Sequence, residues 1–317
     1  IKEVFNILPI NLFLEIYLLT LVEQSMLFFS SNLEILNMIM YIMYILNYPC
    51  NDSTYFWHIV SVSKDNLNEE NKFVGKVMVS ILGVNATYDE SIDTSAFGSY
   101  HYIVDIDNKK LIFKESLDMS INEKEDSENL NKFYYYIKDI IKDKNVESLF
   151  LKTFIKILKS NLDSFIFKDQ DNSTPKKYNS FFKNKNKNNY YHTNRKIQEF
   201  FYDFCLNILT LFYQDNTLVG SFDKIKRIEF NKEEQNRKIK ELGINSQSKS
   251  MSEGESIFLE LFRGAVKYKT YFENFIQNKD TMDVYKIALL FSDEFINLKL
   301  KDGNNLALKE KSFFDII

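Results

Sequence analysis

The spacing of apolar residues predicts a helix, a buried strand and a second helix at the start of the chain. Apolar side chains surround Glu15 throughout residues 9–22, as in a helix that is buried on most of its circumference. Residues 26–29 form a short uninterrupted apolar run between polar residues, which is typical of a strand buried on both faces. Ser31 or Asn32 then caps a long apolar helix, which we expect to end before the next proline.

Further strands are predicted downstream by runs of β-branched and aromatic residues. We expect strands at residues 56–60, within residues 76–84 with an end near Gly83, and at residues 101–106. Residues 110–113 are predicted to return as a hairpin arm. Because helices and strands alternate in the first part of the chain, the pattern predicts the α/β class, with an open sheet flanked by helices.

The second half of the chain has a different, mostly helical pattern. Residues 115–131 are acidic and polar and predict an exposed loop or linker, whereas residues 132–167 predict two helices divided near Lys144-Asn145. Residues 168–196 are basic and of low complexity, and we expect a mobile loop there. Helical spacing returns in three stretches, at residues 197–213, 256–277 and 283–298.

These changes of character divide the chain into three parts. We predict an α/β lobe at residues 1–115, a linker with a helical connector and a basic loop at residues 116–196, and a helical region at residues 197–317. With 317 residues, of which 45% are hydrophobic, the chain is long enough to bury the cores of two compact units. The sequence begins with isoleucine, and we expect it to be part of a longer protein.

The charge and the cysteine content narrow the class of protein. A formal net charge of -4 and a pI near 5.6 argue against a general nucleic-acid binder, which would show a basic excess. Cys50 and Cys205 cannot form a disulfide framework, and we expect two free thiols in a reducing compartment. The apolar run at residues 35–48 is shorter than the roughly 20 residues needed to cross a bilayer, so we expect no membrane span.

Residues with catalytic or metal-binding chemistry are sparse. The sequence holds three histidines and no P-loop, C-x-x-C or H-E-x-x-H motif. We expect His58 to be a hydrogen-bonded histidine of a buried strand, and His101 and His192 to be exposed. Asp105 and Asp107 resemble a carboxylate pair, but their position near a turn favours turn geometry over acid–base catalysis. We therefore expect no catalytic residue, no cofactor and no metal.

Two aromatic segments leave alternatives open. The run at residues 133–136 either faces a partner or places one helix face in the core and leaves the remainder half exposed. The basic tract within residues 168–196 either binds acidic lipid or RNA or is a solvated loop. The acidic total charge of the chain favours the solvated loop.

The ordered set of apolar segments resembles the DENN domain family. Residues 8–49 resemble the start of its central region, with a helix, an apolar strand that ends in two serines, a long apolar helix and a Tyr-Pro pair. Residues 57–60 resemble the next strand of that region, and residues 81–85 resemble its apolar Gly-Val segment. Residues 104–108 resemble its Val-Asp-Leu-Asp turn. Residues 199–213 and 258–276 look like the first and last signature helices of the downstream DENN region, with Lys267-Tyr268-Lys269 at the place of the family's Thr-Gln-Met-Phe.

This resemblance implies a fold, an activity and a set of partners. The fold would be a flavodoxin-like lobe followed by a helical region. The activity would be that of a guanine-nucleotide exchange factor, or of its C-terminal part, which promotes GDP release from a Rab-type small GTPase in vesicle trafficking. The implied partners are a Rab GTPase and either an upstream longin-like lobe of the same polypeptide or a partner DENN protein, without nucleic acid. The implied location is the cytoplasm, with peripheral association to intracellular membranes.

The loop after the strand that ends near Gly83 is the predicted docking site. It leaves the carboxyl end of a predicted sheet strand, where open α/β sheets place their sites. Among Asn85, Thr87, Tyr88 and Asp89, the tyrosine offers a large amphipathic contact and the aspartate offers a charge for a basic residue of the GTPase switch. The alternative is that Asn85 and Asp89 build the loop and Tyr88 covers the sheet edge.

Two other functions remain open. A scaffold with a DENN-type fold would hold partner proteins and perform no exchange. An enzyme would use the α/β lobe to bind a flavin or a dinucleotide, but Ser30-Ser31-Asn32 stand where a glycine-rich phosphate loop would follow the first strand.

Overall fold

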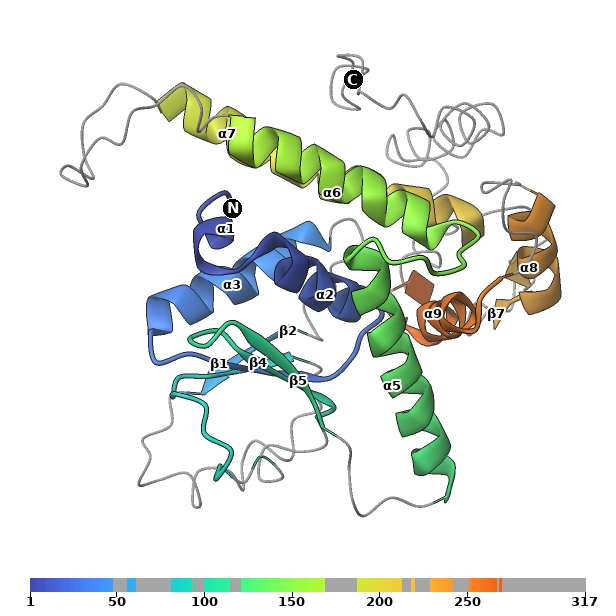
Figure 1. The fold of residues 1–317 in the computed structure, drawn as a ribbon, viewed down its shortest axis with the longest axis horizontal. Helices are drawn as coiled ribbons and strands as arrows, with labels where there is room; N and C mark the ends of the chain where they lie inside the picture. The colour runs from blue at the N-terminus through green and yellow to red at the C-terminus, as the bar shows by residue number, and fades with distance from the viewer. Residues whose placement is uncertain are drawn as a thin grey trace, which may run out of the picture. The chain divides into compact units, whose positions relative to one another are not determined.

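The chain forms two compact units, which are described separately (Figure 1). The sheet unit holds Glu3–Glu147 and Met251–Asn274, and the helical unit holds Ile1–Lys2, Ser148–Ser250 and Phe275–Ile317. The structure is a computed structural model that describes residues 1–47, 56–60, 81–92, 94, 100–114, 121–168, 187–212, 218–219, 229–241, 251–266 and 268–269.

An open five-stranded sheet forms the centre of the sheet unit and confirms the predicted α/β class. Its order is β2-β3-β1-β4-β5, with β5 antiparallel to β4 and the other pairs parallel. A flavodoxin-like sheet has the order 2-1-3-4-5, whereas here β3 rather than β1 adjoins β2, so the flavodoxin-like topology is not confirmed. The strands are β1 (Met26–Phe29), β2 (Phe56–Val60), β3 (Ile81–Val84), β4 (Tyr102–Asp105) and β5 (Lys110–Phe113).

The central strand β1 is buried along its whole length. It pairs with β3 along one edge and with β4 along the other, so that Met26 lies opposite both Ile81 and Tyr102. All four of its residues are apolar and buried. This composition follows from its position, because a strand with neighbours on both edges and cover on both faces meets no solvent.

Helices cover one face of the sheet, and loops cover the other (Figure 1). On the helix side, the Tyr102 hydroxyl donates to the carbonyl of Leu130 at 3.2 Å. The opposite face carries a core of Leu27, Phe29, Leu82, Val84 and Ile103, against which loop residues such as Tyr88, Ile92 and Tyr100 pack. The helices of this unit are α1 (Val4–Ile7), α2 (Ile10–Leu21), α3 (Leu33–Leu46), α5 (Ile121–Ile141) and α9 (Glu253–Gly264).

Two segments that were predicted as loops are helical in part. α5 begins at Ile121, inside the predicted linker, and α7 begins at Lys187, inside the predicted basic loop. The polar start of α5 is joined to buried positions from Leu130 onward, and Glu128 pairs with Lys132 one turn later at 3.0 Å. Because adding a turn to an existing helix is easier than starting one, the buried stripe and the ion pair allow the helix to continue through polar residues that have no apolar pattern.

The C-terminal part of the sheet unit also departs from the predicted pattern. α9 begins after the Ser252 cap and ends at Gly264, where Ala265 has an extended backbone, so the helix predicted over residues 256–277 is interrupted. Because α5 and α9 both belong to the sheet unit, the compact units divide the chain at other places than residues 115 and 196. The helix predicted at residues 283–298 lies outside the described residues.

α5 and α9 approach each other closely at Gly254. A Cβ atom at this glycine would overlap the ring of Tyr136. Further along the contact, the rings of Phe133 and Phe258 lie 6.1 Å apart. Lys132 also bonds Glu253 at 3.0 Å across the same pair of helices. The absence of a side chain at Gly254 therefore sets how near the two helices come.

We expect Gly254→Ala to lower the free energy of unfolding by about 1–3 kcal/mol, because the added methyl group overpacks the contact with Tyr136. Gly264→Ala is the matched control, since a Cβ there meets no atom within 4 Å and alanine is the better helix former. Urea unfolding followed by circular dichroism measures both variants. Equal midpoints for the two variants would contradict the close packing.

Tyr134 of α5 contacts the outer edge of the edge strand β5. The Lys114 N–H donates to the His101 carbonyl at 2.8 Å, so these two opposite residues form a hydrogen-bonded pair. Because hydrogen-bonded and non-hydrogen-bonded pairs alternate in an antiparallel ladder, Leu111 and Val104 form a non-hydrogen-bonded pair, and the carbonyl of Leu111 points away from β4. The Tyr134 hydroxyl of α5 donates to this carbonyl at 3.2 Å, and its ring stacks on Phe113. An acceptor that another strand would pair with is thus occupied.

Glu15 of α2 is a carboxylate buried beside α5, with 6% of its surface exposed. Burial raises its pKa, and the positive charges of Lys138 and Lys142 offset part of this rise. The ionised carboxylate is therefore disfavoured in the folded protein relative to the unfolded chain.

We expect Glu15→Gln to stabilise the protein in a pH-dependent way. The pKa of Glu15 is raised above its ordinary value of 4.5, so its contribution to stability is full below that value and is lost as the pH rises through the folded pKa. The melting temperature of Glu15→Gln should exceed that of the unaltered chain at about pH 8, and the difference should shrink toward pH 4. The exposed Glu3→Gln is the control. A difference that grows on acidification would contradict the assignment.

The helical unit is built around α6 (Leu151–Lys168) and α7 (Lys187–Phe212), which pack side by side. The rings of Phe165 and Phe200 meet edge to face at 5.8 Å across this pair. Cys205 is buried as a free thiol, as predicted, and Cys50 lies outside the described residues. Among the helices that the structure describes, none is long and apolar enough to cross a membrane.

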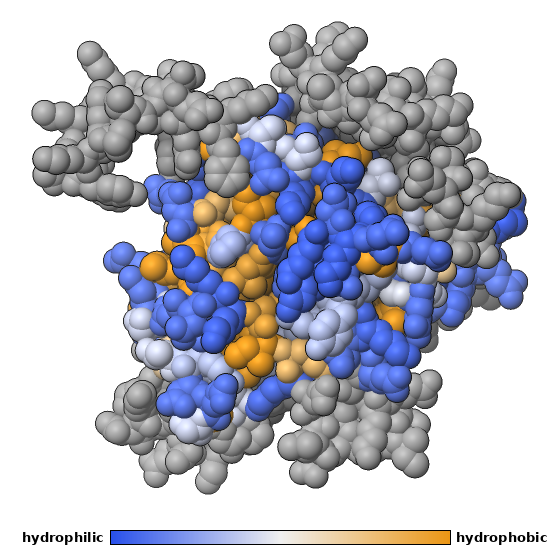
Figure 2. Space-filling view, viewed as in Figure 1, coloured by the Kyte–Doolittle hydropathy of each residue, from blue (hydrophilic) through white to orange (hydrophobic). Residues whose placement is uncertain are grey.

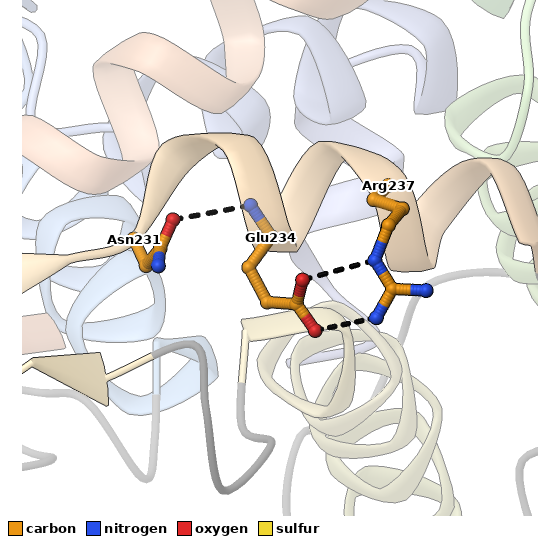
Figure 3. Close-up of polar contacts among 3 residues, drawn as sticks. All are labelled: Asn231, Glu234 and Arg237. Carbon is orange, nitrogen blue, oxygen red and sulfur yellow. Dashed lines mark hydrogen bonds and ion pairs between the residues drawn. The ribbon is translucent and has the colours of Figure 1, made fainter.

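A short helix, α8 (Lys232–Glu241), follows the two-stranded ribbon of β6 (Leu218–Val219) and β7 (Glu229–Phe230). Asn231 caps it by accepting a hydrogen bond from the backbone N–H of Glu234 at 3.1 Å (Figure 3). The Glu234 carboxylate then binds the guanidinium of Arg237 with two bonds of 2.9 and 2.6 Å. Cap and ion pair fix where this polar helix starts.

Candidate functional site at the carboxyl edge of the sheet

The carboxyl ends of β1, β3 and β4 meet at one edge of the sheet, which is called the carboxyl edge here. It comprises residues 30–32 after β1, residues 85–91 after β3 and residues 106–108 after β4. The chain leaves β1 toward β2 and leaves β4 toward β5, so these two neighbouring strands are continued in opposite directions along the sheet. Open α/β sheets place their sites at such a point, and this edge is the candidate site.

Ser30 joins the three loops of the carboxyl edge. Its hydroxyl donates to Asp107 Oδ1 at 2.8 Å and accepts from the backbone N–H of Asn32 at 3.2 Å. Its carbonyl accepts from Asn85 Nδ2 at 2.9 Å, and its own N–H donates to the Val84 carbonyl at 3.3 Å. Each strand end is therefore held to its neighbours through one buried residue.

The carboxylates Asp105 and Asp107 support the backbone, in agreement with the predicted turn role. Asp105 accepts from the backbone N–H of Asn108 at 3.1 Å and from its amide at 2.8 Å, which closes the turn between β4 and β5. Asp107 Oδ2 accepts from the N–H of Ser31 at 2.8 Å. Lys109, with φ of 55°, completes the turn in the left-handed region.

Asn32, and not Ser31, is the N-terminal cap of α3. Its Oδ1 accepts from the N–H groups of Glu34 at 2.9 Å and Ile35 at 3.2 Å. Glu34 places a negative charge in the first turn, where the helix dipole favours it.

The predicted docking residues divide into inward and outward groups. Asn85 bonds Ser30, and the half-buried Tyr88 packs on the ring of Phe29 with centroids 5.2 Å apart. Thr87 and Asp89 are exposed, and Asp89 Oδ1 also accepts from the N–H of Ser91 at 2.9 Å. These contacts agree with the alternative in which Asn85 and Asp89 build the loop and Tyr88 packs on the sheet, whereas docking through this loop stays a prediction.

The docking loop, defined as residues 85–90, has an acidic tip. Burial raises the pKa of the Tyr88 phenol, and the negative charges of Glu90, Asp105 and Asp89 raise it further. Tyr88 is therefore a neutral hydrogen-bonding group throughout the physiological range. Asp89 and Glu90 are both exposed, so the loop offers negative charge to whatever meets it.

Other predicted residues lie elsewhere. His101 was predicted to be exposed, but it is half buried at the opposite end of β4, with Nδ1 3.0 Å from the Ser25 hydroxyl. In the aromatic run of α5, Tyr135 is 57% exposed while its three neighbours are buried, which matches a core-facing helix. His192 belongs to α7, and the side chains of His58 and His192 lie outside what is described. Within the described residues, no cluster of three or more His, Cys, Asp or Glu side chains is arranged to hold a metal ion.

Sequence reasoning did not find the Ser30–Asp107 pair. The two residues are 77 positions apart, and only the parallel pairing of β1 with β4 brings them together. The available signal was a serine directly after an apolar strand and an aspartate directly after another. Their partnership follows once both strands are assigned to neighbouring places in the sheet.

Comparisons with protein-family models, with curated proteins and with solved structures found no match to this chain.

Asp107→Ala should loosen the carboxyl edge. It removes the acceptors of the Ser30 hydroxyl and the Ser31 N–H, and we expect the free energy of unfolding to fall by about 1–3 kcal/mol. Amide hydrogen exchange at Ser31 should become faster. Asp107→Asn, which keeps one oxygen acceptor, should lose less, and the exposed Glu90→Ala should change stability by less than about 0.5 kcal/mol. Equal losses in all three variants would contradict this role.

Proposed function

We propose that the carboxyl edge docks a Rab-type small GTPase and promotes the release of its GDP. The observation that carries this proposal is an outward-facing acidic loop on a fixed base. Thr87, Asp89 and Glu90 are exposed, while Asn85 and Tyr88 tie the loop to β1. A loop that is already held in place loses little conformational entropy when it binds, which favours it as a protein-docking element.

The order of the segments supports a DENN-type assignment. The segments that resemble the central DENN region form the strands β1, β2, β3 and β4 of one sheet and the helix α3. The strands β1, β3 and β4 end at the carboxyl edge. The proposal depends on this edge and does not require a flavodoxin-like strand order. A Rab partner would bring the protein to the cytoplasmic surface of intracellular membranes.

An exchange factor acts through differential binding and changes no covalent bond. It binds the nucleotide-free GTPase more tightly than the loaded form, and by reciprocity it weakens nucleotide binding by the same factor. Release becomes faster when the transition state for release is stabilised more than the loaded complex. In this proposal Asp89 pairs with a basic residue of a switch segment, and the exposed part of Tyr88 contacts the same segment.

The polar groups at the switch point favour a protein partner over a bound cofactor. Ser30, Asn85 and Asp107 satisfy one another through hydrogen bonds of 2.8 and 2.9 Å. A phosphate group at this point would have to displace these bonds and would meet the carboxylate of Asp107. At the tip of the loop, in contrast, the side chains of Thr87, Asp89 and Glu90 are exposed.

The test is the release of fluorescent GDP from a panel of Rab GTPases in the presence of the whole polypeptide. We expect acceleration for one Rab or a few, and we expect Asp89→Arg to reduce the rate about tenfold or more, because it reverses the charge at the tip of the loop. Glu147→Arg makes the same change at an exposed carboxylate that follows α5 and should stay within about twofold of the unaltered protein.

Two outcomes would count against exchange activity. A folded protein that accelerates no Rab of the panel would overturn the proposal. A tight, stoichiometric complex with a GTPase whose nucleotide release is unchanged would identify the alternative function, a scaffold with a DENN-type fold.

A further inference from the structure

Few serine and threonine hydroxyl groups are presented at the surface in a form that another enzyme could modify. Figure 2 shows hydrophilic residues spread widely over the surface, so exposure alone does not select a site. Among the residues whose exposure is described, the exposed serine and threonine side chains are those of Ser31, Thr87, Ser91, Ser160 and Ser164. The local backbone distinguishes these five residues.

Three of the five hydroxyl groups belong to helices or to a helix start. Ser160 and Ser164 lie within α6, and Ser31 directly precedes the residue that caps α3. A hydroxyl group accepts a phosphoryl group only when it comes within about 3–3.5 Å of the phosphorus inside the cleft of a kinase. A helical backbone hinders this approach, because the neighbouring turns of the helix would have to enter the cleft as well.

The other two hydroxyl groups, of Thr87 and Ser91, lie in the loop segment after β3. Ser91 is part of a closed turn: its N–H donates to Asp89 Oδ1 at 2.9 Å, and the N–H of Ile92 donates to the Asp89 carbonyl at 2.9 Å. Residues 87–89, in contrast, form no regular secondary structure. Thr87 is therefore the exposed hydroxyl group whose local backbone best suits a kinase cleft.

The residues that follow Thr87 are acidic. Asp89 and Glu90 lie two and three positions after it, and both are exposed. The adjacent Tyr88 senses the same charges, because Glu90, Asp105 and Asp89 all raise the pKa of its phenol. Kinases choose their substrates in part by charge pattern, so this segment fits a kinase whose substrate cleft is basic.

We propose that Thr87 is a phosphorylation site for an acidophilic serine/threonine kinase, and that its phosphate strengthens the docking loop as a binding surface for the GTPase. In this step Thr87 Oγ1 forms a bond to the γ-phosphorus of ATP while the bond from that phosphorus to the bridging β–γ oxygen breaks. The hydroxyl proton passes to the catalytic aspartate of the kinase, and ADP leaves. The identity of the site stands apart from the proposed function, whereas the effect of the phosphate rests on it.

The expected effect follows from the charge of the loop. Residues 85–90 carry two carboxylates and no basic residue. A phosphate adds about 1.5–2 negative charges at pH 7, which roughly doubles the charge of the loop. Opposite a basic residue of a switch segment, its oxygens accept charge-assisted hydrogen bonds. Phosphorylation should therefore accelerate GDP release from the responsive Rab about three- to tenfold at low salt, and less at high salt.

The first experiment locates the phosphate. The whole polypeptide is incubated with ATP and an acidophilic kinase of the casein-kinase type, and fragmentation mass spectrometry identifies the modified residue. We expect phosphate on Thr87 in the unaltered protein and in Ser91→Ala. In Thr87→Val, which keeps the branched shape and lacks the hydroxyl group, we expect no phosphate within residues 85–92.

A matched pair of variants tests the acidic determinant. Glu90→Gln should lower the kcat/KM for phosphorylation of Thr87 about tenfold or more, because it removes the charge three positions after the acceptor. Glu34→Gln makes the same change at an exposed carboxylate three positions after Ser31 and should stay within about twofold of the unaltered protein. Melting temperatures establish that both variants are folded.

The second experiment measures the effect of the phosphate on exchange. Release of fluorescent GDP is compared before and after kinase treatment, with the kinase removed. Thr87→Val taken through the same treatment is the control, and its rate should be the same before and after.

The possible failures are distinguishable. Absence of phosphate from Thr87, or an equal kcat/KM for Glu90→Gln and Glu34→Gln, overturns the assignment of the site. A phosphorylated Thr87 with unchanged or slower GDP release from a responsive Rab overturns the effect assigned to the phosphate. A phosphorylated Thr87 in a protein that accelerates no Rab in either form overturns the proposed function and supports the site.

Discussion

The pairing of β1 with β3 on one edge and β4 on the other determines the position of everything else in the sheet unit. Both pairings are parallel and residue for residue, so Phe29 lies level with Val84 and with Asp105. As a result the three strands end at the same height, and the residues that follow them are brought within hydrogen-bonding distance. Ser30 can reach Asn85 and Asp107 only because the three strands are in this register.

The carboxyl edge combines bonded polar groups on its inside with exposed charged groups. Its inner polar groups bond one another, while its charged groups at Asp89, Glu90 and Glu34 remain outside. On the helix-covered side of the sheet, α3 exposes Leu33 and Tyr41. In the proposed function, the charge at this edge is recognised by a basic surface of the partner, and nucleotide release is governed by coupled binding equilibria.

Much of the sheet unit could be predicted from the sequence. An unbroken apolar run predicts β1, and a long apolar segment after a polar cap residue predicts α3. The hairpin of β4 and β5 is predicted by two runs of strand-forming residues on either side of a turn. The strand order could not be read in this way, because it depends on pairings between segments 55 and 76 positions apart, as for Met26 with Ile81 and Tyr102. The start of α5 was missed because its polar residues carry no periodic signal. Its helical state comes from the buried residues after Leu130.

The docking loop illustrates the same limit. Asn85 and Tyr88 are residue types that occur both in turns and in interfaces, so the sequence does not show which way they face. In the structure Asn85 bonds the carbonyl of Ser30 and Tyr88 packs on the ring of Phe29, so both face inward. Thr87 and Asp89 were distinguishable from them only by exposure, which is a property of the packed structure.

The discontinuity of the sheet unit has a consequence for its biosynthesis. α9 supplies Phe258 against Phe133 and the closely fitting Gly254 against Tyr136, yet the 103 residues from Ser148 to Ser250 are translated between the two parts of the unit. At about 5–20 residues per second, this interval lasts roughly 5–20 s. During that time the nascent sheet unit holds α5 without its partner helix, with an apolar stripe open to chaperones or to other nascent chains. The speed at which the helical unit is translated therefore controls when the sheet unit can close.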